Sequence, residues 1–157
     1  MRSALLVLLF TLNTAHAAAL KTEDYPAVPD WVVRGLAAVE TKSYFTPSGR
    51  LVYVDRSGDS GDSDDGRGPF QTTNAAFDMV RRPGERWANL ATDFRLAEAV
   101  ARRYIGFLYL EKAGKDWTTA MAWYRKGSHY RCAEAQDYAR RAAAIGAQLS
   151  PLPVQEH

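Results

Sequence analysis

Apolar residues recur at helical spacing through most of the chain, and short polar segments interrupt them. Hydrophobic positions at i, i+3 or i+4 and i+7 are typical of a helix that buries one face. Asp, Ser or Thr before such a segment can cap its first turn, and Gly or Pro commonly follows its end. These signals predict helices over residues 31–41, from Thr72 or Thr73 to about 80, from Thr92 or Asp93 to about 112, 117–126 and about 131–147. The predicted caps of the first, fourth and fifth helices are Asp30, Asp116 and Ser128.

A different pattern separates the first two helices. Residues 51–54 are rich in Val, Leu and Tyr and follow a Pro-Ser-Gly turn, which predicts a short β-strand. Residues 57–66 are polar, acidic and rich in glycine, which predicts an exposed loop. The fold class expected is therefore α+β, mainly α, with a small β and loop insertion after the first helix. Gly35 weakens the first helix, and we expect it to allow close packing of another element.

The N-terminal residues have the features of a signal peptide over residues 1–17. Arg2 precedes a short apolar run over residues 4–12, and Ala15-His16-Ala17 matches the small-x-small pattern of a cleavage site. That run is shorter than the roughly 20 apolar residues of a membrane span, and we expect no integral membrane segment after cleavage. The protein is thus expected to be exported, to the periplasm or outside the cell. The predicted division is an extended lead-in over 18–29, one domain over 30–148 and a flexible tail over 149–157.

Charge and composition exclude several classes of partner. The formal net charge is +2, with no basic stripe, so neither nucleic acid nor an anionic membrane is expected as a partner. Cys132 is the single cysteine, so no internal disulfide can form. No cofactor or metal site is predicted. The acidic run over residues 59–65 leaves calcium as an alternative, but it lacks the closing Glu of a calcium-binding loop.

Glu40 is the strongest candidate for chemistry. It lies near the end of the first predicted helix and shares a face with Val33 and Leu36. Burial disfavours a charged carboxylate and raises its pKa. A carboxylic acid that is neutral near pH 7 can protonate the leaving oxygen of a glycosidic bond. The alternative is a surface residue at a frayed helix end, paired with Lys42.

Three blocks of the sequence share a pattern with a known superfamily. Ala-Val-Glu-Thr-Lys-Ser (38–43) resembles its helix ending in Glu-Ser, and Gly-Arg-Gly-Pro-Phe-Gln (66–71) resembles its Gly-Leu-Met-Gln turn. Ala-Met-Ala-Trp-Tyr-Arg-Lys-Gly (120–127) resembles its Ala-Ala-Tyr-Asn-Ala-Gly block. The order and spacing of these blocks, within residues 31–138, resemble the lysozyme-like superfamily, specifically soluble lytic transglycosylases and goose-type lysozymes. The resemblance implies a lysozyme-like catalytic domain with a cleft between a helical body and a small β-containing lobe.

The resemblance also implies a substrate and roles for individual residues. The substrate would be peptidoglycan glycan strands, cut at the β-1,4 bond between N-acetylmuramic acid and N-acetylglucosamine. Glu40 would be the catalytic acid, Gln71 a polar contact in the cleft and Tyr124 a neighbour of the acid. Three departures lie at expected substrate-binding positions: Thr41 for Ser, Phe70 for Met, and Arg125 for an Asn that usually contributes to sugar binding. From residue type alone, a bond to backbone explains Gln71 equally well. A place in the core is the alternative for Tyr124, but we favour the edge of the cleft because tyrosine tolerates one end in water.

These expectations leave the reaction open between two mechanisms. A lytic transglycosylase needs only Glu40 as general acid and base, and this is the mechanism we favour. A hydrolytic muramidase of the inverting type needs a second carboxylate about 6.5–9.5 Å away to activate water. Asp55, Asp59, Asp62, Asp64 and Asp65 all lie between Glu40 and Gln71 in the sequence, and no spacing singles one out. A third alternative is a non-catalytic glycan-binding protein of the same shape; the sequence leaves the oligomeric state open.

Overall fold

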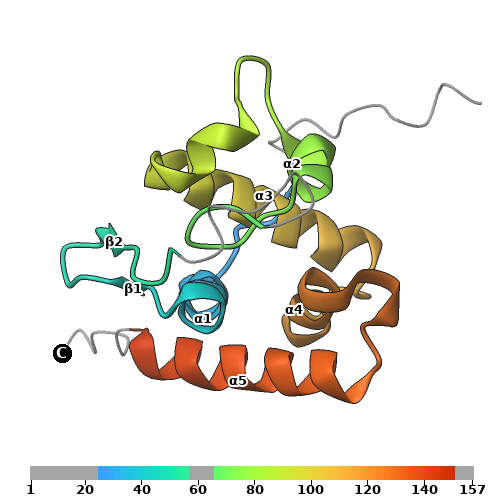
Figure 1. Cartoon of the computed structure of the whole chain (residues 1–157). Coiled ribbons are helices and arrows are strands. Elements are labelled where there is room, and N and C mark those ends of the chain that lie inside the picture. Colours follow the sequence, from blue (N-terminus) through green and yellow to red (C-terminus); the bar gives the residue numbers. More distant parts are fainter. Residues whose placement is uncertain (1–24, 57–65, 151–157) are drawn as a thin grey trace, which may run out of the picture.

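The computed structural model describes residues 25–56 and 66–150. Helices dominate these residues, with one small antiparallel sheet, so the predicted α+β, mainly α class is confirmed (Figure 1). The elements, in order, are α1 (Asp30–Thr41), β1 (Tyr44–Phe45), β2 (Leu51–Val52), α2 (Asn74–Val80), η2 (Trp87–Ala91), α3 (Phe94–Glu111), α4 (Trp117–Lys126), η3 (Gly127–His129) and α5 (Ala133–Leu149). The predicted signal peptide, the acidic run 59–65 and residues 151–157 of the predicted tail lie outside the described residues.

Side-chain caps fix the starts of three helices where the sequence predicts them. Thr73 accepts from the N–H of Ala76 at 3.2 Å, and Asp93 accepts from the N–H of Leu96 at 3.0 Å. Asp116 caps α4 in the same way, and α4 ends at Lys126 before Gly127, which has a positive φ of 53°. These predicted boundaries are confirmed because each depends on residues within one turn of the helix end.

Two predicted caps are wrong. Pro29 occupies the cap position of α1, and Asp30 is the first helical residue, with a carboxylate that accepts from Arg102 Nη2 at 2.8 Å. Ser128 lies within η3, and α5 begins later, at Ala133, with exposed Cys132 in the cap position. In the first case Arg102, on a distant helix, binds the Asp30 carboxylate that was predicted to cap the backbone of α1.

The strand that follows the Pro-Ser-Gly turn is shorter than predicted, and its partner was not predicted. Tyr44 pairs with Val52 and Phe45 with Leu51 in the antiparallel β1–β2 hairpin. After β2 the backbone N–H of Asp55 donates to the carbonyl of Thr41 at 2.9 Å. The chain therefore returns from the hairpin to the C-terminal end of α1.

The backbones of α1 and α5 lie in direct contact. A Cβ added at Gly35 would lie 2.1 Å from the carbonyl oxygen of Ala142, and one at Gly146 would lie 1.9 Å from that of Trp31. The expectation that Gly35 allows close packing is thus confirmed. The contacts along the two helices pair Trp31 with Gly146, Gly35 with Ala142, and Glu40 with Tyr138. This order means that α1 and α5 run antiparallel.

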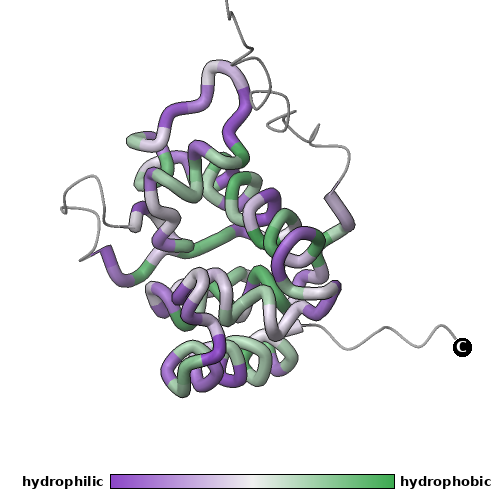
Figure 2. Tube along the Cα trace, turned by 90° about the vertical axis from the view of Figure 1, so that its right-hand side faces the viewer, coloured by the Kyte–Doolittle hydropathy of each residue, from purple (hydrophilic) through white to green (hydrophobic). Residues whose placement is uncertain are grey.

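The remaining helices complete a single core. Figure 1 shows α1 and α4 lying against α5, with α2 and α3 on their other side, in agreement with the contacts between these elements. Figure 2 shows hydrophobic positions along the helices and a mostly hydrophilic loop after α2. Burial of apolar side chains between helices is the main force that stabilises such a fold. The fully buried large side chains include Leu36, Phe70, Leu90, Val100, Ile105 and Met121.

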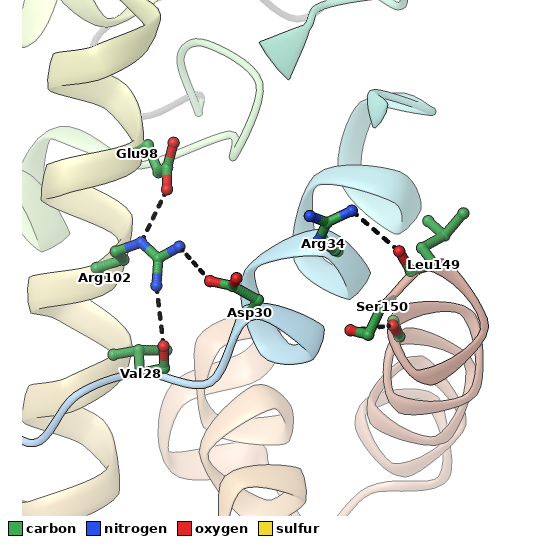
Figure 3. Close-up of polar contacts among 8 residues, drawn as sticks. Val28, Asp30, Arg34, Glu98, Arg102, Leu149 and Ser150 are labelled. Atoms are coloured by element: carbon green, nitrogen blue, oxygen red, sulfur yellow. Dashed lines mark hydrogen bonds and ion pairs between the residues drawn. The ribbon is translucent and has the colours of Figure 1, made fainter. Parts of the chain in front are cut away.

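Polar contacts tie the N-terminal end of α1 to its neighbours (Figure 3). Arg102 of α3 donates to the carbonyl of Val28 at 2.9 Å and forms ion pairs with Asp30 and Glu98, each at 2.8 Å. On the other side, Arg34 donates to the carbonyl of Leu149 near the end of α5, at 2.9 Å. No helix within residues 25–56 and 66–150 combines the length and apolar character needed to cross a membrane.

Candidate active site

Glu40 lies in the last turn of α1 and is directed at α5. Its Oε1 accepts a hydrogen bond from the hydroxyl of Tyr138 at 2.5 Å, across 98 residues of sequence. Tyr138 is buried, with 4% of its surface exposed, whereas Glu40 is only partly buried. The acid thus lies at the edge of the core with one carboxylate oxygen held by a fixed donor.

Burial raises the pKa of Glu40 above its usual value of 4.5, as its place on an apolar helix face predicts. The hydrogen bond from Tyr138 and the positive charge of Arg125 both oppose this shift, and desolvation exceeds them. The pKa of Tyr138 is raised well above 10, first by burial and then by the neighbouring Glu40. Tyr138 therefore stays protonated near neutral pH and can donate to the Glu40 carboxylate.

The segment that carries Gln71 is a tight turn. Arg67 and Thr72 exchange backbone hydrogen bonds of 3.0 and 3.1 Å, and the Gln71 N–H donates to the carbonyl of Gly68 at 3.0 Å. Gln71 itself has a positive φ of 46°. A Cβ at Gly66 would lie 2.2 Å from the carbonyl oxygen of Gln71, so only glycine fits there. Gly66 of the motif is thus explained by the shape of the turn.

Two hydroxyl groups fasten this turn next to the acid. Thr41, the residue after Glu40, donates from Oγ1 to the carbonyl of Pro69 at 2.9 Å. Tyr124 of α4 donates to the carbonyl of Phe70 at 2.8 Å. Burial is the main cause that raises the pKa of Tyr124, and the charge of Glu40 adds to this rise. The turn is therefore held between the end of α1 and α4.

The other predicted site residues differ in how far they are buried and in what they contact. Phe70 is fully buried, so its side chain belongs to the core and its carbonyl serves as the acceptor for Tyr124. Gln71 is partly buried, and its Nε2 donates to the carbonyl of Gly68 at 3.0 Å, the backbone partner that residue type alone allowed. Arg125 is exposed, and its guanidinium lies 5.7 Å from the centre of the Tyr138 ring. Glu40, Thr41, Tyr124 and Arg125 thus form one neighbourhood.

Tyr138 is the site residue that sequence reasoning missed. The periodicity of the last helix places it on an apolar face with Ala142 and Ile145, which is typical of a core residue. Nothing near it in the sequence indicates a partner on α1. Its role depends on the antiparallel register of α1 and α5, which the sequence pattern alone does not specify.

Asp55 is the one candidate second carboxylate among the described residues, and its N–H contacts the C-terminal end of α1 at the carbonyl of Thr41. The described residues contain no cluster of three or more His, Cys, Asp or Glu that suits a metal ion. Asp55 forms an ion pair with Lys42 at 3.7 Å, and the other candidate second carboxylates lie in the undescribed run. A groove of about 660 Å³ lies between the hairpin turn and the start of α3, and Glu40 is not among its lining residues.

The three blocks that carry the resemblance meet in space. The first contacts the second through Thr41 and Pro69, and the second contacts the third through Phe70 and Tyr124. In comparisons with protein-family models, with curated proteins and with solved structures, the chain matches none.

Proposed function

We propose that this protein is an exported enzyme that cuts peptidoglycan glycan strands at the β-1,4 bond between N-acetylmuramic acid and N-acetylglucosamine, as a lytic transglycosylase. One observation carries the proposal. Glu40 has a raised pKa and a fixed donor in Tyr138, and it lies beside a glycine-rich turn that both α1 and α4 hold. A general acid of this kind is required to cleave a glycosidic bond near neutral pH.

In the proposed reaction Glu40 acts first as an acid and then as a base. Its proton passes to the leaving glycosidic oxygen as the bond to the muramic acid C1 breaks. The N-acetyl group of the substrate stabilises the cationic centre at C1. The Glu40 carboxylate then takes the proton of the C6 hydroxyl, whose oxygen closes a 1,6-anhydro ring on C1.

Within the described residues, the groups that act on Glu40 suit the single-acid mechanism. The charged neighbour that shifts its pKa within the described residues is a cation, Arg125. Tyr138 steadies the carboxylate that forms after the first proton transfer, because a hydrogen bond to a charged acceptor is stronger than one to a neutral acceptor. Neither residue can activate a water molecule as a carboxylate base does.

The test compares the purified protein with Glu40→Gln and with Glu111→Gln as a matched control. Glu111 is an exposed carboxylate at the end of α3. We expect the wild type and Glu111→Gln to release soluble fragments from purified cell walls and Glu40→Gln to release none, with all three folded by circular dichroism. Product mass identifies the reaction, because anhydro ends are one water lighter than reducing ends. Equal release by Glu40→Gln contradicts the proposal, and binding without cleavage by the wild type indicates a glycan-binding protein.

A further inference from the structure

A cation lies beside the acid where the resembled family has a neutral amide. Arg125 is on α4, directly after Tyr124, and its side chain is 43% exposed. Its guanidinium lies over the ring of Tyr138, and its charge lowers the pKa of Glu40 against the larger effect of burial. A ligand at Glu40 therefore meets a positive charge at the same place.

Arg125 is held loosely by its protein partner. Its Nη2 contacts Glu134 Oε1 at 3.4 Å, a long distance for a charge-assisted hydrogen bond. Glu134 has a closer partner in Lys126, whose Nζ lies 2.9 Å from Oε2. A guanidinium carries five N–H donors in a planar fork that matches a carboxylate. Arg125 can thus turn to an anionic ligand while Glu134 keeps its ion pair with Lys126.

We infer that Arg125 selects glycan strands that carry a free carboxylate beside the bond to be cut, namely strands whose muramic acid lactyl groups bear no peptide. The inference rests on the proposed function and names the substrate class of the same site. The lactyl ether is attached two ring carbons from the C1 that reacts. In peptide-bearing strands its carboxyl group is tied up in an amide and carries no charge. The reaction that supplies this substrate is therefore hydrolysis of the amide that joins the peptide to the lactyl group.

Binding such a carboxylate also favours the form of the acid that the reaction needs. The carboxylate offsets the positive charge of Arg125, which lowers the pKa of Glu40 in the free protein. With that charge offset, Glu40 holds its proton to higher pH. Selection of the substrate and readiness of the acid are thus linked through one side chain.

The test uses three strands of equal length: peptide-bearing strands, peptide-free strands, and peptide-free strands whose lactyl carboxylates are converted to neutral amides. The proteins are the full-length wild type, Arg125→Gln and Arg125→Lys. Arg131→Gln is the matched control, because Arg131 also lies over a tyrosine ring, that of Tyr130, at 5.3 Å. The readouts are kcat/KM for each strand and the thermal midpoint of each variant.

We expect the wild type and Arg131→Gln to cleave the peptide-free strand about tenfold faster than the amidated one, the discrimination that about 1.4 kcal/mol gives. Arg125→Gln cleaves both at one rate, and Arg125→Lys keeps part of the preference. Equal rates for the wild type, or a preference that survives in Arg125→Gln, overturn the inference. A wild type that cuts peptide-bearing strands as fast as peptide-free ones also overturns it, since the carboxylate recognised then belongs to the peptide.

Binding measurements separate this inference from the proposed function. Affinities are measured by calorimetry in the Glu40→Gln background, where no strand is cut, with and without Arg125→Gln. Tighter binding of the peptide-free strand that disappears with Arg125→Gln supports the inference even where the wild type cleaves nothing. Cleavage that needs Glu40 but shows no dependence on the lactyl charge supports the proposed function alone.

Discussion

Replacing Tyr138 by Phe removes one hydroxyl group and leaves its ring in place. The hydroxyl donates to Glu40 at 2.5 Å, and this bond opposes the rise that burial causes in the pKa of Glu40. A hydrogen bond to a charged group contributes about 1.5–3 kcal/mol and one between neutral groups about 0.5–1.5 kcal/mol. The free energy of unfolding should therefore fall by about 1 kcal/mol more when Glu40 is ionised than when it is neutral.

The sign follows from linkage between folding and protonation. Because the pKa of Glu40 is raised in the folded protein, stability is lost as pH rises through that pKa, in a window above 4.5. The Tyr138 hydrogen bond reduces this loss, so Tyr138→Phe should move the pKa of Glu40 further upward. The variant is consequently most destabilised at the alkaline side of the window.

The assay is urea unfolding at about pH 4 and about pH 8, with the wild type and Tyr138→Phe compared at each pH. The control repeats the comparison in the Glu40→Gln background, where the cost of Tyr138→Phe should be the same at both values. An equal cost at both values with Glu40 intact would refute the reasoning. A pH dependence that persists with Gln at this position would refute it as well.

Three further predictions concern the acid, its cation and the helix contact. Glu40→Gln should lower kcat by about 10²–10⁴-fold. The same variant should unfold at higher urea than the wild type at about pH 8 but not at about pH 4, because Gln buries no charge. Lower stability than the wild type at both pH values would contradict this prediction. Arg125→Gln should shift the alkaline fall of kcat/KM to higher pH, since the cation lowers the pKa of Glu40; a fall at unchanged or lower pH would count against electrostatic contact. Gly35→Ala should lower the free energy of unfolding by about 1–3 kcal/mol or more, because its Cβ would lie 2.1 Å from the Ala142 carbonyl oxygen. Gly106→Ala, with 3.2 Å to its nearest neighbouring atom, should cost less in the same urea experiment.

Helix boundaries were predictable where the deciding residues lie within one turn. Asp116 and Gly127 bound α4 as the sequence predicts, and Asp93 starts α3. The prediction was wrong for Asp30 because Arg102, far away in the sequence, binds its carboxylate. The hairpin partner β1 was not predicted because a strand of two residues is too short to show an alternating pattern. It is a strand only because Leu51 and Val52 pair with it.

The candidate site shows the same division between local and distant information. The partial burial of Glu40 follows from the periodicity of its own helix. Thr41 at that helix end contacts the turn that carries Gln71, and Tyr124 contacts the same turn, whereas the sequence supplies this arrangement only through a resemblance. Tyr138 was missed because its distance from Glu40 depends on how two helices are aligned.

The contact between α1 and α5 also limits which insertions the protein can accept. Main chain touches main chain at Gly35 and Gly146, so no side chain larger than that of glycine fits between the two helices at these positions. Removing one residue between Gly35 and Glu40 would turn the acid by about 100° around the axis of α1 and away from Tyr138. Two segment lengths are therefore constrained, that from Gly35 to Glu40 and that from Tyr138 to Ala142. They are constrained as strictly as the identities of these four residues. We therefore expect the protein to tolerate changes of length only in the connections between the helices.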